Sequence, residues 1–555
     1  MIRNTGMVLT LLVFSMQLHA ADSRNIYTQP DIPSQEALDR LNMKMVWRAF
    51  SPMEGRRDGY HDIQILDNHV VAQTRSGTVV LFHGSTGETM WKTNFGKPYQ
   101  VVHNLAFNDK FIFAVNENDL YALHRKDGAI AWRASLAISL TAAPSADNVH
   151  VYLCGLNRRI YCYALPKFGS DNQFIGYEKT DRLGKLKVQT VAEIAETEFD
   201  PGSAGIFLGK GTRTQGQQPL LIWEFPTQIN MIYPPLVTEE QVAVVGQKGD
   251  LVTLDKFSES RMTTRLTHQP YATDGPVIST PEIKENIAYI GATDSALHAY
   301  DLKLGKLRWR FTVGSTITQR AFVTPNEVFI SGERTGLSKV SNDFGDPMWS
   351  IPNRGRFSNY QEKSERVISA NPKFVYTLDK SGRMVILDRN TGTALTTWDI
   401  HDFVFPVTNR THDRVFLAAN NGLIVCLRDR DYPNPVFHFE PKQTPQAGTE
   451  VNPKTPVDEM LLKALEMPIM EPAAEEKPLK EVLAAISQKY MIAFELSPKG
   501  FGEQKLEEVE AKPVKTPAAE NKPLKEWLAE ILIQAQIEFM PVDKKILLYQ
   551  AKMEK

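Results

Sequence analysis

The chain has 555 residues, of which 63 are lysine or arginine and 65 are aspartate or glutamate, so its formal net charge is only -2. A charge so close to zero gives no overall attraction for nucleic acid or for an anionic membrane surface. With 42% hydrophobic and 23% charged residues, the composition is that of a globular protein and excludes collagen-like and globally disordered chains.

Residues 1–21 have the features of a signal peptide. A basic start at Arg3 precedes an apolar run over residues 7–18, and the small residues Ala20 and Ala21 mark a cleavage site. The run is too short to span a hydrocarbon core of about 30 Å, and no later segment reaches the roughly 20 apolar residues that a spanning helix needs. No cysteine stands at the cleavage site to accept a lipid. We therefore expect an exported protein of the periplasm or cell envelope, without a transmembrane segment or lipid anchor.

After an N-terminal extension over residues 22–44, a β-rich run, a tight polar turn and a second β-rich run recur eight times within residues 45–440. Apolar and polar residues alternate in each run, as in a strand with one buried face. The turns are 40 to 46 residues apart, except for one interval of 91. Such a period with only strands in each unit predicts an eight-bladed β-propeller, and hence a mainly β fold. The first runs begin near Val70, Phe111, Val149, Val242, Ile287, Val328, Phe374 and Val415, and the turns lie near Gly77, Asn118, Arg158, Gly249, Ser295, Gly336, Gly382 and Gly422.

Most units close with a glycine followed by a tryptophan. Glycine tolerates the positive φ of a tight turn, and a large aromatic ring fills the space between neighbouring blades. We therefore predict that these residues have a structural docking role in the core. The pairs are Gly87 with Trp91, Gly128 with Trp132, Gly305 with Trp309, Gly345 with Trp349, and Gly392 with Trp398, and Trp223 is the tryptophan of the third unit.

The long interval falls in the third unit. Gly169 predicts an aromatic residue near position 173, but the pattern resumes only at Trp223, 50 residues later. One interpretation is an insertion over about residues 170–219, between the last two strands of that blade, and the other is a degenerate ninth blade. Residues 170–219 contain glycines, glutamines and mixed charges without periodicity, which favours an exposed element used for binding.

Trp47, in Val46-Trp47-Arg48, precedes the first full unit and indicates an outer strand without a blade of its own. We expect this strand to pair with the last unit, residues 414–427. Such a pairing would close the ring and remove the free sheet edges at which propellers would otherwise aggregate.

The C-terminal part begins with a proline-rich linker at residues 441–457, followed by a small α+β module at residues 458–550. Four prolines and few apolar residues make the linker unable to bury a core. In the module, Pro478 and Pro523 each open a helix with an apolar face, and short strands follow at about residues 491–496, 537–540 and 545–549.

The segments HGSTGETMW, HRKDGAIAW and YDLKLGKLRW resemble the tryptophan-docking repeat of the PQQ-like β-propeller family, over roughly residues 45–439. That family includes both quinoprotein alcohol dehydrogenases and scaffolds related to the outer-membrane assembly propeller BamB. The resemblance therefore implies the fold and leaves the function open. The C-terminal module resembles the short N-terminal modules of secretins and TonB-dependent receptors, which dock partners, although the charged, proline-containing residues 497–520 depart from that pattern.

The family's dehydrogenases hold their quinone with a disulfide between adjacent cysteines and a calcium ion, and neither has a recognisable counterpart here. Cys154, Cys162 and Cys426 are not adjacent. Cys154 and Cys162 flank the turn at Arg158, and two interpretations are open: a disulfide across the hairpin, or two reduced core thiols. Phosphate-binding loops, nucleophile elbows and paired metal-ligating histidines are also missing. We predict no catalytic residue, no cofactor and no metal.

The leading hypothesis is a non-enzymatic, exported scaffold for protein–protein interaction, a monomeric propeller with envelope proteins as partners and no nucleic acid. A role like that of BamB in outer-membrane protein assembly is one specific form of this hypothesis. The alternatives are a PQQ-dependent dehydrogenase and a sugar-binding propeller.

Overall fold

A computed structural model describes residues 30–55, 57–168, 174–180, 186–189, 219–257, 262–353, 356–439, 468–471, 476–490, 493–496, 509, 512–535, 537–542 and 545–550. The predicted signal peptide at residues 1–21 and the predicted linker at residues 441–457 lie outside these ranges, as does most of the predicted insertion. The chain divides into two compact units, Met1–Lys442 and Gln443–Lys555. The first contains the repeats and the second the C-terminal module.

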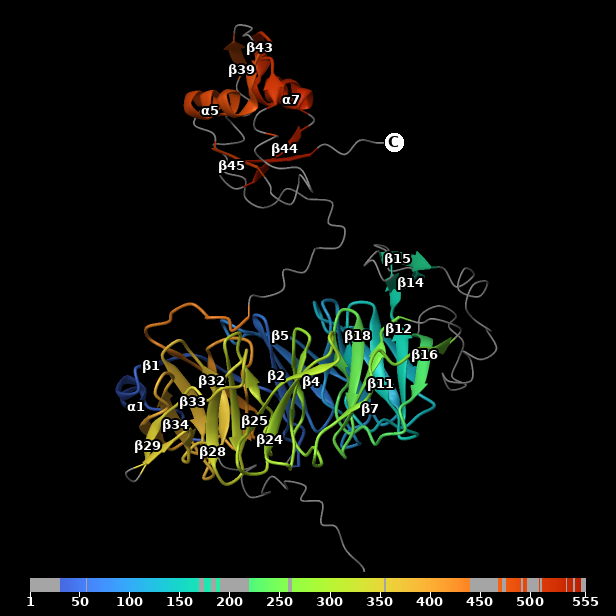
Figure 1. The fold of residues 1–555 in the computed structure, drawn as a ribbon, viewed down its shortest axis with the longest axis vertical. Helices are drawn as coiled ribbons and strands as arrows, with labels where there is room; N and C mark the ends of the chain where they lie inside the picture. The colour runs from blue at the N-terminus through green and yellow to red at the C-terminus, as the bar shows by residue number, and fades with distance from the viewer. Residues whose placement is uncertain are drawn as a thin grey trace, which may run out of the picture. The chain divides into compact units, whose positions relative to one another are not determined.

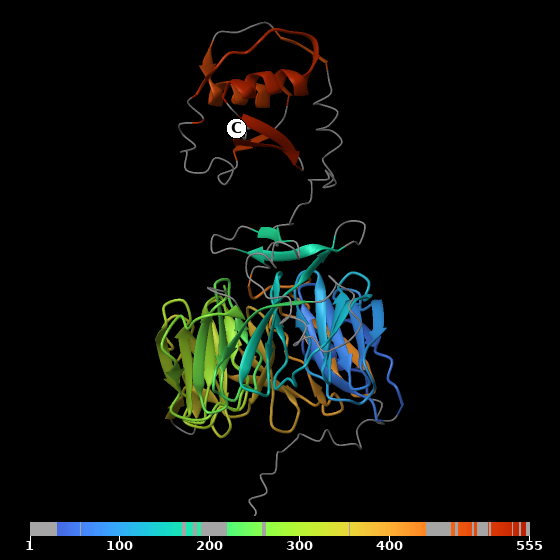
Figure 2. The ribbon, with the colours of Figure 1, turned by 90° about the vertical axis from the view of Figure 1, so that its right-hand side faces the viewer.

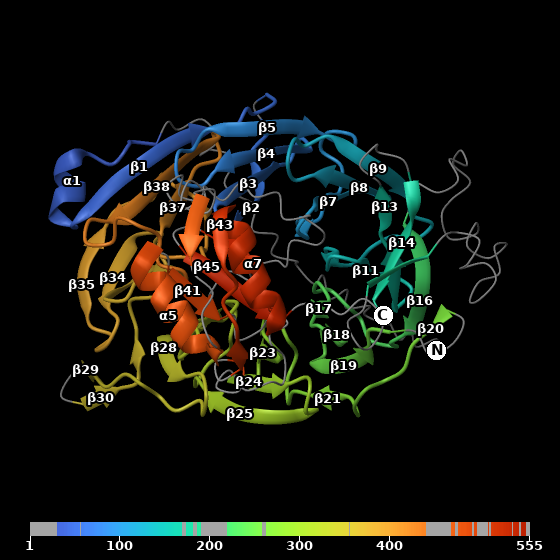
Figure 3. The same cartoon turned by 90° about the horizontal axis from the view of Figure 1, so that it is seen from above.

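The first unit is an eight-bladed β-propeller, as predicted, and its blades surround a central axis (Figure 1, Figure 3). Within each blade the strands follow one another from the axis outward, with β1 outermost in the last blade.

Blade one consists of β2 (Tyr60–Leu66), β3 (His69–Thr74), β4 (Thr78–His83) and β5 (Thr89–Asn94), and blade two of β6 (Ala106–Phe107), β7 (Phe111–Asn116), β8 (Asp119–His124) and β9 (Ile130–Ser135). Blade three consists of β10 (Ser145–Ala146), β11 (His150–Cys154), β12 (Arg159–Ala164) and β16 (Leu220–Pro226), and blade four of β17 (Leu236–Val237), β18 (Gln241–Val245), β19 (Asp250–Asp255) and β21 (Tyr271–Ala272).

Blade five consists of β22 (Glu282–Lys284), β23 (Ile287–Gly291), β24 (Ala296–Asp301) and β25 (Lys306–Thr312), and blade six of β26 (Phe322–Val323), β27 (Glu327–Gly332), β28 (Gly336–Ser341) and β31 (Tyr360–Gln361). Blade six also carries a hairpin of β29 (Ile351–Asn353) and β30 (Arg356–Ser358). Blade seven consists of β32 (Arg366–Ala370), β33 (Phe374–Leu378), β34 (Met384–Asp388) and β35 (Ala394–Trp398), and blade eight of β36 (Phe405–Pro406), β37 (Val415–Ala418), β38 (Leu423–Asp429) and β1 (Met43–Phe50).

The runs that the sequence analysis placed first in each unit are the second strands of the blades. Five of the inner strands, such as β6 and β17, are only two residues long. A two-residue strand shows no alternation of polar and apolar residues, so the hydrophobic pattern cannot reveal it.

The ring is closed by β1, which pairs antiparallel with β38 and sets Trp47 opposite Cys426. This confirms the pairing predicted from Trp47. A short helix, α1 (Gln35–Arg40), precedes β1, and the Ser34 hydroxyl caps its first turn by accepting a hydrogen bond from the Ala37 amide. The side-chain amide of Asn42 donates a hydrogen bond to the Asp429 carboxylate at 3.1 Å, which links the two ends of the propeller.

In blade three the chain leaves the sheet between its third and fourth strands. β12 pairs directly with β16, with Cys162 opposite Trp223, although 55 residues separate the two strands. Within that interval β13 (Pro166–Phe168), β14 (Phe174–Thr180) and β15 (Leu186–Gln189) form a separate three-stranded sheet. Figure 2 shows this sheet, in teal, beyond the ends of the blade strands. A further strand, β20 (Met262–Thr263), runs parallel to the outer edge of β16.

The core of the propeller lies in the seams between blades. One buried cluster joins Phe113 and Trp132 of blade two to Leu153 and Tyr161 of blade three, and similar clusters fill other seams. Because each sheet buries its faces against two neighbours, second and third strands such as β7 and β4 are buried along most of their length.

The second unit is a small α+β domain. Its elements are β39 (Pro468–Glu471), β40 (Lys477–Pro478), α5 (Leu479–Tyr490), β41 (Ala493–Leu496), β42 (Pro513–Val514), β43 (Ala519–Pro523), α7 (Leu524–Gln534), β44 (Ile537–Val542) and β45 (Lys545–Gln550). The apolar faces of α5 and α7 pack on Ile546 and Leu548 of β45 in one core. Within the described residues, no helix is long and apolar enough to cross a membrane.

Candidate functional site

The docking tryptophans connect neighbouring blades. The indole Nε1 of Trp47 donates to the carbonyl oxygen of Gly84 in blade one at 2.7 Å, and a Cβ atom at Gly87 would lie only 2.6 Å from the Trp47 ring. Each glycine is therefore covered by a ring from the preceding blade, not by the tryptophan that follows it in its own unit. The same arrangement joins Trp91 to Arg125 and Gly128, Trp309 to Asn342 and Gly345, and Trp349 to Arg389 and Gly392, and Trp223 donates to the carbonyl of Lys256.

Three seams depart from this rule. Trp132 is buried, but its Nε1 has no hydrogen-bond partner among the described residues, and the chain beyond the seam continues into β13 and the blade-three excursion. Gly305 is covered by the ring of His268, in place of a tryptophan. Trp398 is half-buried and packs beside the cluster between blades seven and eight. His268 was missed because the search was for tryptophan, although it precedes Gly305 by 37 residues, the same separation as Trp91 and Gly128.

The three cysteines are buried free thiols, so the disulfide considered between Cys154 and Cys162 is not formed. The strand register explains why: Cys154 is opposite Ile160, and Cys162 is opposite Tyr152. Burial raises the pKa of the Cys154 thiol to about 12. A thiol held so strongly in its protonated form is a core residue and not a nucleophile.

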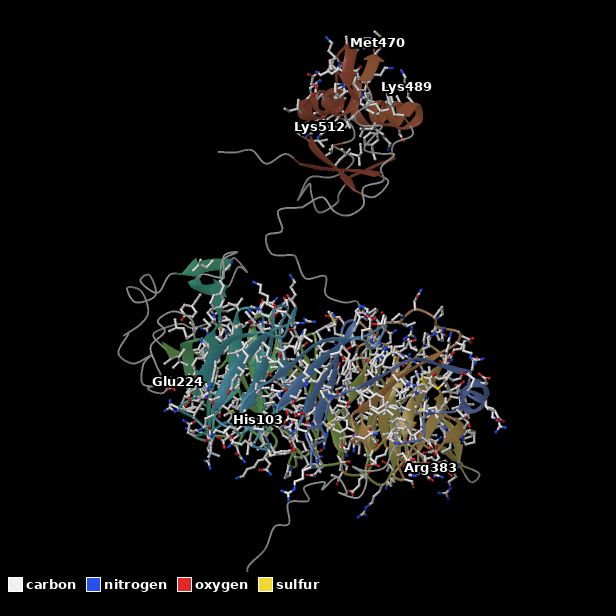
Figure 4. All side chains as sticks on the ribbon, turned by 180° about the vertical axis from the view of Figure 1, so that it is seen from behind. His103, Glu224, Arg383, Met470, Lys489 and Lys512 are labelled. Atoms are coloured by element: carbon white, nitrogen blue, oxygen red, sulfur yellow. The ribbon has the colours of Figure 1, made fainter. Side chains whose placement is uncertain are left out.

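A polar cavity of about 620 Å³, called here the axial cavity, is lined mainly by inner-strand and loop residues from blades one, five, six, seven and eight, together with Phe329, Ser331 and Leu337 of β27 and β28. Its charged lining consists of Asp62, Glu282, Lys284, Arg320, Glu365, Arg366 and Arg410. A second cavity of about 580 Å³ shares Gln64, Asn104, Thr280 and Arg320 with it and is lined also by His103, which Figure 4 labels. The two cavities are therefore neighbours within the propeller.

Glu282 is the centre of an ion network in the axial cavity. Its side chain is 4% exposed, and its Oε2 atom lies 2.8 Å from Nε of Arg320 and 3.1 Å from Nε of Arg410. Burial alone would raise the pKa of Glu282, but the two guanidinium groups outweigh burial and lower it. Burial and the neighbouring Arg320 lower the pKa of Arg410 to about 10. One carboxylate is thus shared by two arginines.

Two further cations of the cavity form no ion pair with a described carboxylate. Nε of Arg366 donates to the neutral amide oxygen of Gln319 at 2.9 Å. Nζ of Lys284 lies 4.9 Å from the centre of the Phe439 ring. Burial lowers the pKa of Arg366, although the charge of Glu365 acts against this shift. Burial also lowers the pKa of Lys284, against the charge of Glu282. The hydroxyl of Ser331, which also lines the cavity, is buried without a hydrogen-bond partner.

Residues 436–439, called here the axial strap, contact two residues that line the axial cavity, Lys284 and Phe322. The Val436 amide donates to the Asp413 carboxylate at 3.0 Å, and the His438 amide donates to the carbonyl of Thr411 at 2.9 Å. The ring of His438 packs edge-on against Phe322, which lines the cavity. The strap therefore connects blade eight with the cavity walls of blades five and six. Burial lowers the pKa of His438 to about 4.

The calcium site of the dehydrogenases has no counterpart among the described residues. Calcium needs several carboxylate or amide oxygens that converge on one point. Among the residues that the structure describes, no three His, Cys, Asp or Glu side chains are grouped so that they could hold a metal ion. In the axial cavity, Glu282 is instead occupied by Arg320 and Arg410.

The propeller unit matches a known protein family. A family model described as "Outer membrane protein assembly factor BamB" matches residues 36–196 and 256–430. Among solved structures, BamB from Moraxella catarrhalis is 16% identical with a TM-score of 0.45, covering 70% of this chain and 97% of that one. The computationally designed Ika8 protein is 14% identical with a TM-score of 0.44, covering 69% and 99%. No curated protein gives a significant match.

Proposed function

The chain belongs to the family of the outer-membrane protein assembly factor BamB, and we propose on this basis that it is a non-enzymatic scaffold that assists outer-membrane protein assembly in the bacterial envelope. The family match, which spans both sides of the blade-three excursion, is the observation that carries this proposal. Residues 1–21, with their basic start and apolar run, support export.

The closed ring supports a scaffold role. Its seams are fixed by indole hydrogen bonds between blades, such as that from Trp309 to Asn342, and its last sheet is completed by β1. A propeller held in this way can present loops at its two faces without change in its core. The segment between β12 and β16 is the longest such element within the propeller and is our candidate for partner binding.

The ion network supports the absence of dehydrogenase activity. Catalysis with a quinone requires a carboxylate that is free to take a proton and oxygen ligands that are free to hold calcium. Glu282 has the two arginines as partners and a lowered pKa, which suits neither task.

The scaffold proposal is tested by genetics in the native host. Deletion of the gene should lower the amount of folded outer-membrane β-barrel protein, measured by heat-modifiable mobility on gels, and the wild-type gene should restore it. A variant with residues 170–219 replaced by a short turn should fold with an unchanged propeller melting temperature but fail to restore assembly. Unchanged barrel assembly after deletion would contradict the proposal.

The rival function is tested on the purified protein. With PQQ and calcium added, we expect no alcohol- or sugar-dependent reduction of an electron-accepting dye. Dye reduction that requires both additions would establish a quinoprotein dehydrogenase and overturn the non-enzymatic assignment. Export is tested separately, since N-terminal sequencing of the mature protein should show cleavage next to Ala20 or Ala21.

A further inference from the structure

The part of the chain that the structure describes does not match all the charges of the axial cavity. Four cations line it, Lys284, Arg320, Arg366 and Arg410, and among the described residues only Arg320 and Arg410 form ion pairs, both with Glu282. A partly buried cation without a carboxylate partner is unfavourable because its lost hydration is not replaced. Arg366 and Lys284 are in this position, with a neutral amide and an aromatic ring as their nearest described partners.

The remaining carboxylates do not satisfy these two cations. Asp62 accepts a hydrogen bond from the Gln64 amide at 2.5 Å, and burial raises its pKa, which weakens it as a counter-ion. Glu365 acts on Arg366 through space but forms no ion pair with it within the described residues. The cavity therefore offers two cationic groups that can receive negatively charged oxygens.

The hydroxyl of Ser331 is a second, independent sign of a missing partner. Ser331 is 3% exposed and lines the cavity, and its hydroxyl has no hydrogen-bond partner among the described residues. Buried polar groups in native proteins are nearly always hydrogen-bonded, so an unpartnered hydroxyl on a residue of the cavity wall needs a partner that the described residues do not supply.

The size and the remaining lining define the ligand. At about 620 Å³ the cavity has the volume of a small-molecule site and is much larger than an inorganic phosphate ion. The lining is mostly polar, and the apolar residues Ile63, Phe322, Phe329, Leu337 and Val367 contribute a smaller part of it. A fitting molecule has anionic ends for the cations and a carbon body for these apolar walls.

We propose that the axial cavity is a binding site for a small organic dianion of the dicarboxylate class, held by Arg366 and Lys284 and hydrogen-bonded by Ser331. Arginine pairs with a carboxylate through two parallel hydrogen bonds, so Arg366 is the anchor for one end. Lys284 receives the other end beside the axial strap. This binding function goes beyond the scaffold role, and either can fail without the other.

The test is isothermal titration calorimetry of the full chain with succinate and adipate as probes. We expect saturable, salt-sensitive binding of at least one of them, and binding about tenfold or more weaker in Arg366→Gln, which removes a charge-assisted contact. Lys284→Met should weaken binding as well, and Ser331→Ala should do so by a smaller factor. Arg308→Gln is the matched control, since Arg308 pairs with Asp343 on the outer surface. The affinity of this variant for the dicarboxylates should equal that of the wild type.

Three outcomes would overturn the proposal. They are no saturable binding of either dicarboxylate, an unchanged affinity in both Arg366→Gln and Lys284→Met, and inorganic phosphate binding as tightly as the dicarboxylates. The third result would show a simple anion site without selection for a carbon body. Circular dichroism and the melting temperature of each variant establish that a loss of affinity reflects the site and not the fold.

Discussion

The indole nitrogen of Trp309 donates a 2.8 Å hydrogen bond to the carbonyl oxygen of Asn342, three residues before the glycine that its ring covers. The same offset of three residues separates Gly84 from Gly87, Arg125 from Gly128, and Arg389 from Gly392 in other seams. Each ring therefore fixes the turn of the following blade by packing and by one hydrogen bond.

Replacement of the Trp309 ring tests the packing component. Trp309→Ala removes a large side chain that is 7% exposed and leaves a cavity in the seam between blades five and six. We expect the free energy of unfolding to fall by about 3–5 kcal/mol, measured by urea denaturation followed by tryptophan fluorescence or circular dichroism.

Trp309→Phe and Trp132→Phe form a matched pair that isolates the hydrogen bond. Both keep an aromatic ring in a seam, but within the described parts of the chain only Trp309 has an acceptor for its Nε1. Trp309→Phe should therefore lower the free energy of unfolding by about 1 kcal/mol more than Trp132→Phe in the same denaturation experiment. Equal losses would show that the indole hydrogen bond does not contribute to stability.

Gly345→Ala and Gly382→Ala separate backbone strain from crowding. Both glycines have similar positive φ angles, 74° and 77°, so alanine costs about 1–2 kcal/mol of left-handed strain at either position. A Cβ atom at Gly345 would also lie 2.7 Å from the Trp309 ring, whereas one at Gly382 would have no atom within 4 Å. We expect a clearly lower melting temperature for Gly345→Ala than for Gly382→Ala. Equal melting temperatures would contradict the docking geometry.

The axial strap should make the propeller less stable in acid. The pKa of His438 is lowered to about 4 in the folded state, compared with about 6.5 when unfolded, so between these pH values the unfolded chain binds the additional proton. The stability that His438 contributes is present above pH 6.5 and is lost as pH falls toward 4. His438→Gln should reduce the slope of unfolding free energy against pH in this range, by up to about 1.4 kcal/mol per pH unit.

His401→Gln is the control for this measurement. His401 is exposed, and hydrogen bonding to Asp399 raises its pKa, so its effect on the slope has the opposite sign. If His438→Gln leaves the slope unchanged while the fold is intact, burial of the strap histidine is not a source of the acid sensitivity.

The second unit should unfold independently of the propeller. Trp527 is 4% exposed in the core of that unit, and its Nε1 donates to the carbonyl oxygen of Pro517 at 2.7 Å. Trp527→Ala should lower the unfolding free energy of that unit by about 3–5 kcal/mol. The unfolding transition of the propeller should stay unchanged in differential scanning calorimetry. A single transition lowered as a whole would contradict the division into two units.

The features that repeat along the chain could be predicted from the sequence. The period of the turns gave the blade number, and Trp47 gave the strand that closes the ring, because both depend on local patterns that recur. The two-residue inner strands and the substitution of His268 for a tryptophan were missed, since neither has a local pattern that stands out. The glycine that each docking ring covers was not predicted, because spacing along the chain does not show which neighbour a side chain faces.

The axial cavity could not be predicted for a different reason. Asp62, Glu282, Arg366 and Arg410 come from four blades, and each is an ordinary polar residue in its own segment. Only closure of the ring brings these residues to one cavity. No sequence motif therefore marks the cavity.

The pairing of β1 with β38 also sets the order in which the fold can be completed. Asn42 and Asp429, which are hydrogen-bonded across this junction, are 387 residues apart in the chain. During synthesis, β1 is made first and stays without its partner strand until nearly all of the propeller has emerged, and contacts of such long range form slowly. The outer edge of β38 likewise has no partner strand until β1 pairs with it. A chain that lacks residues 43–50 would therefore expose this edge permanently and should self-associate, even with all the other blades intact.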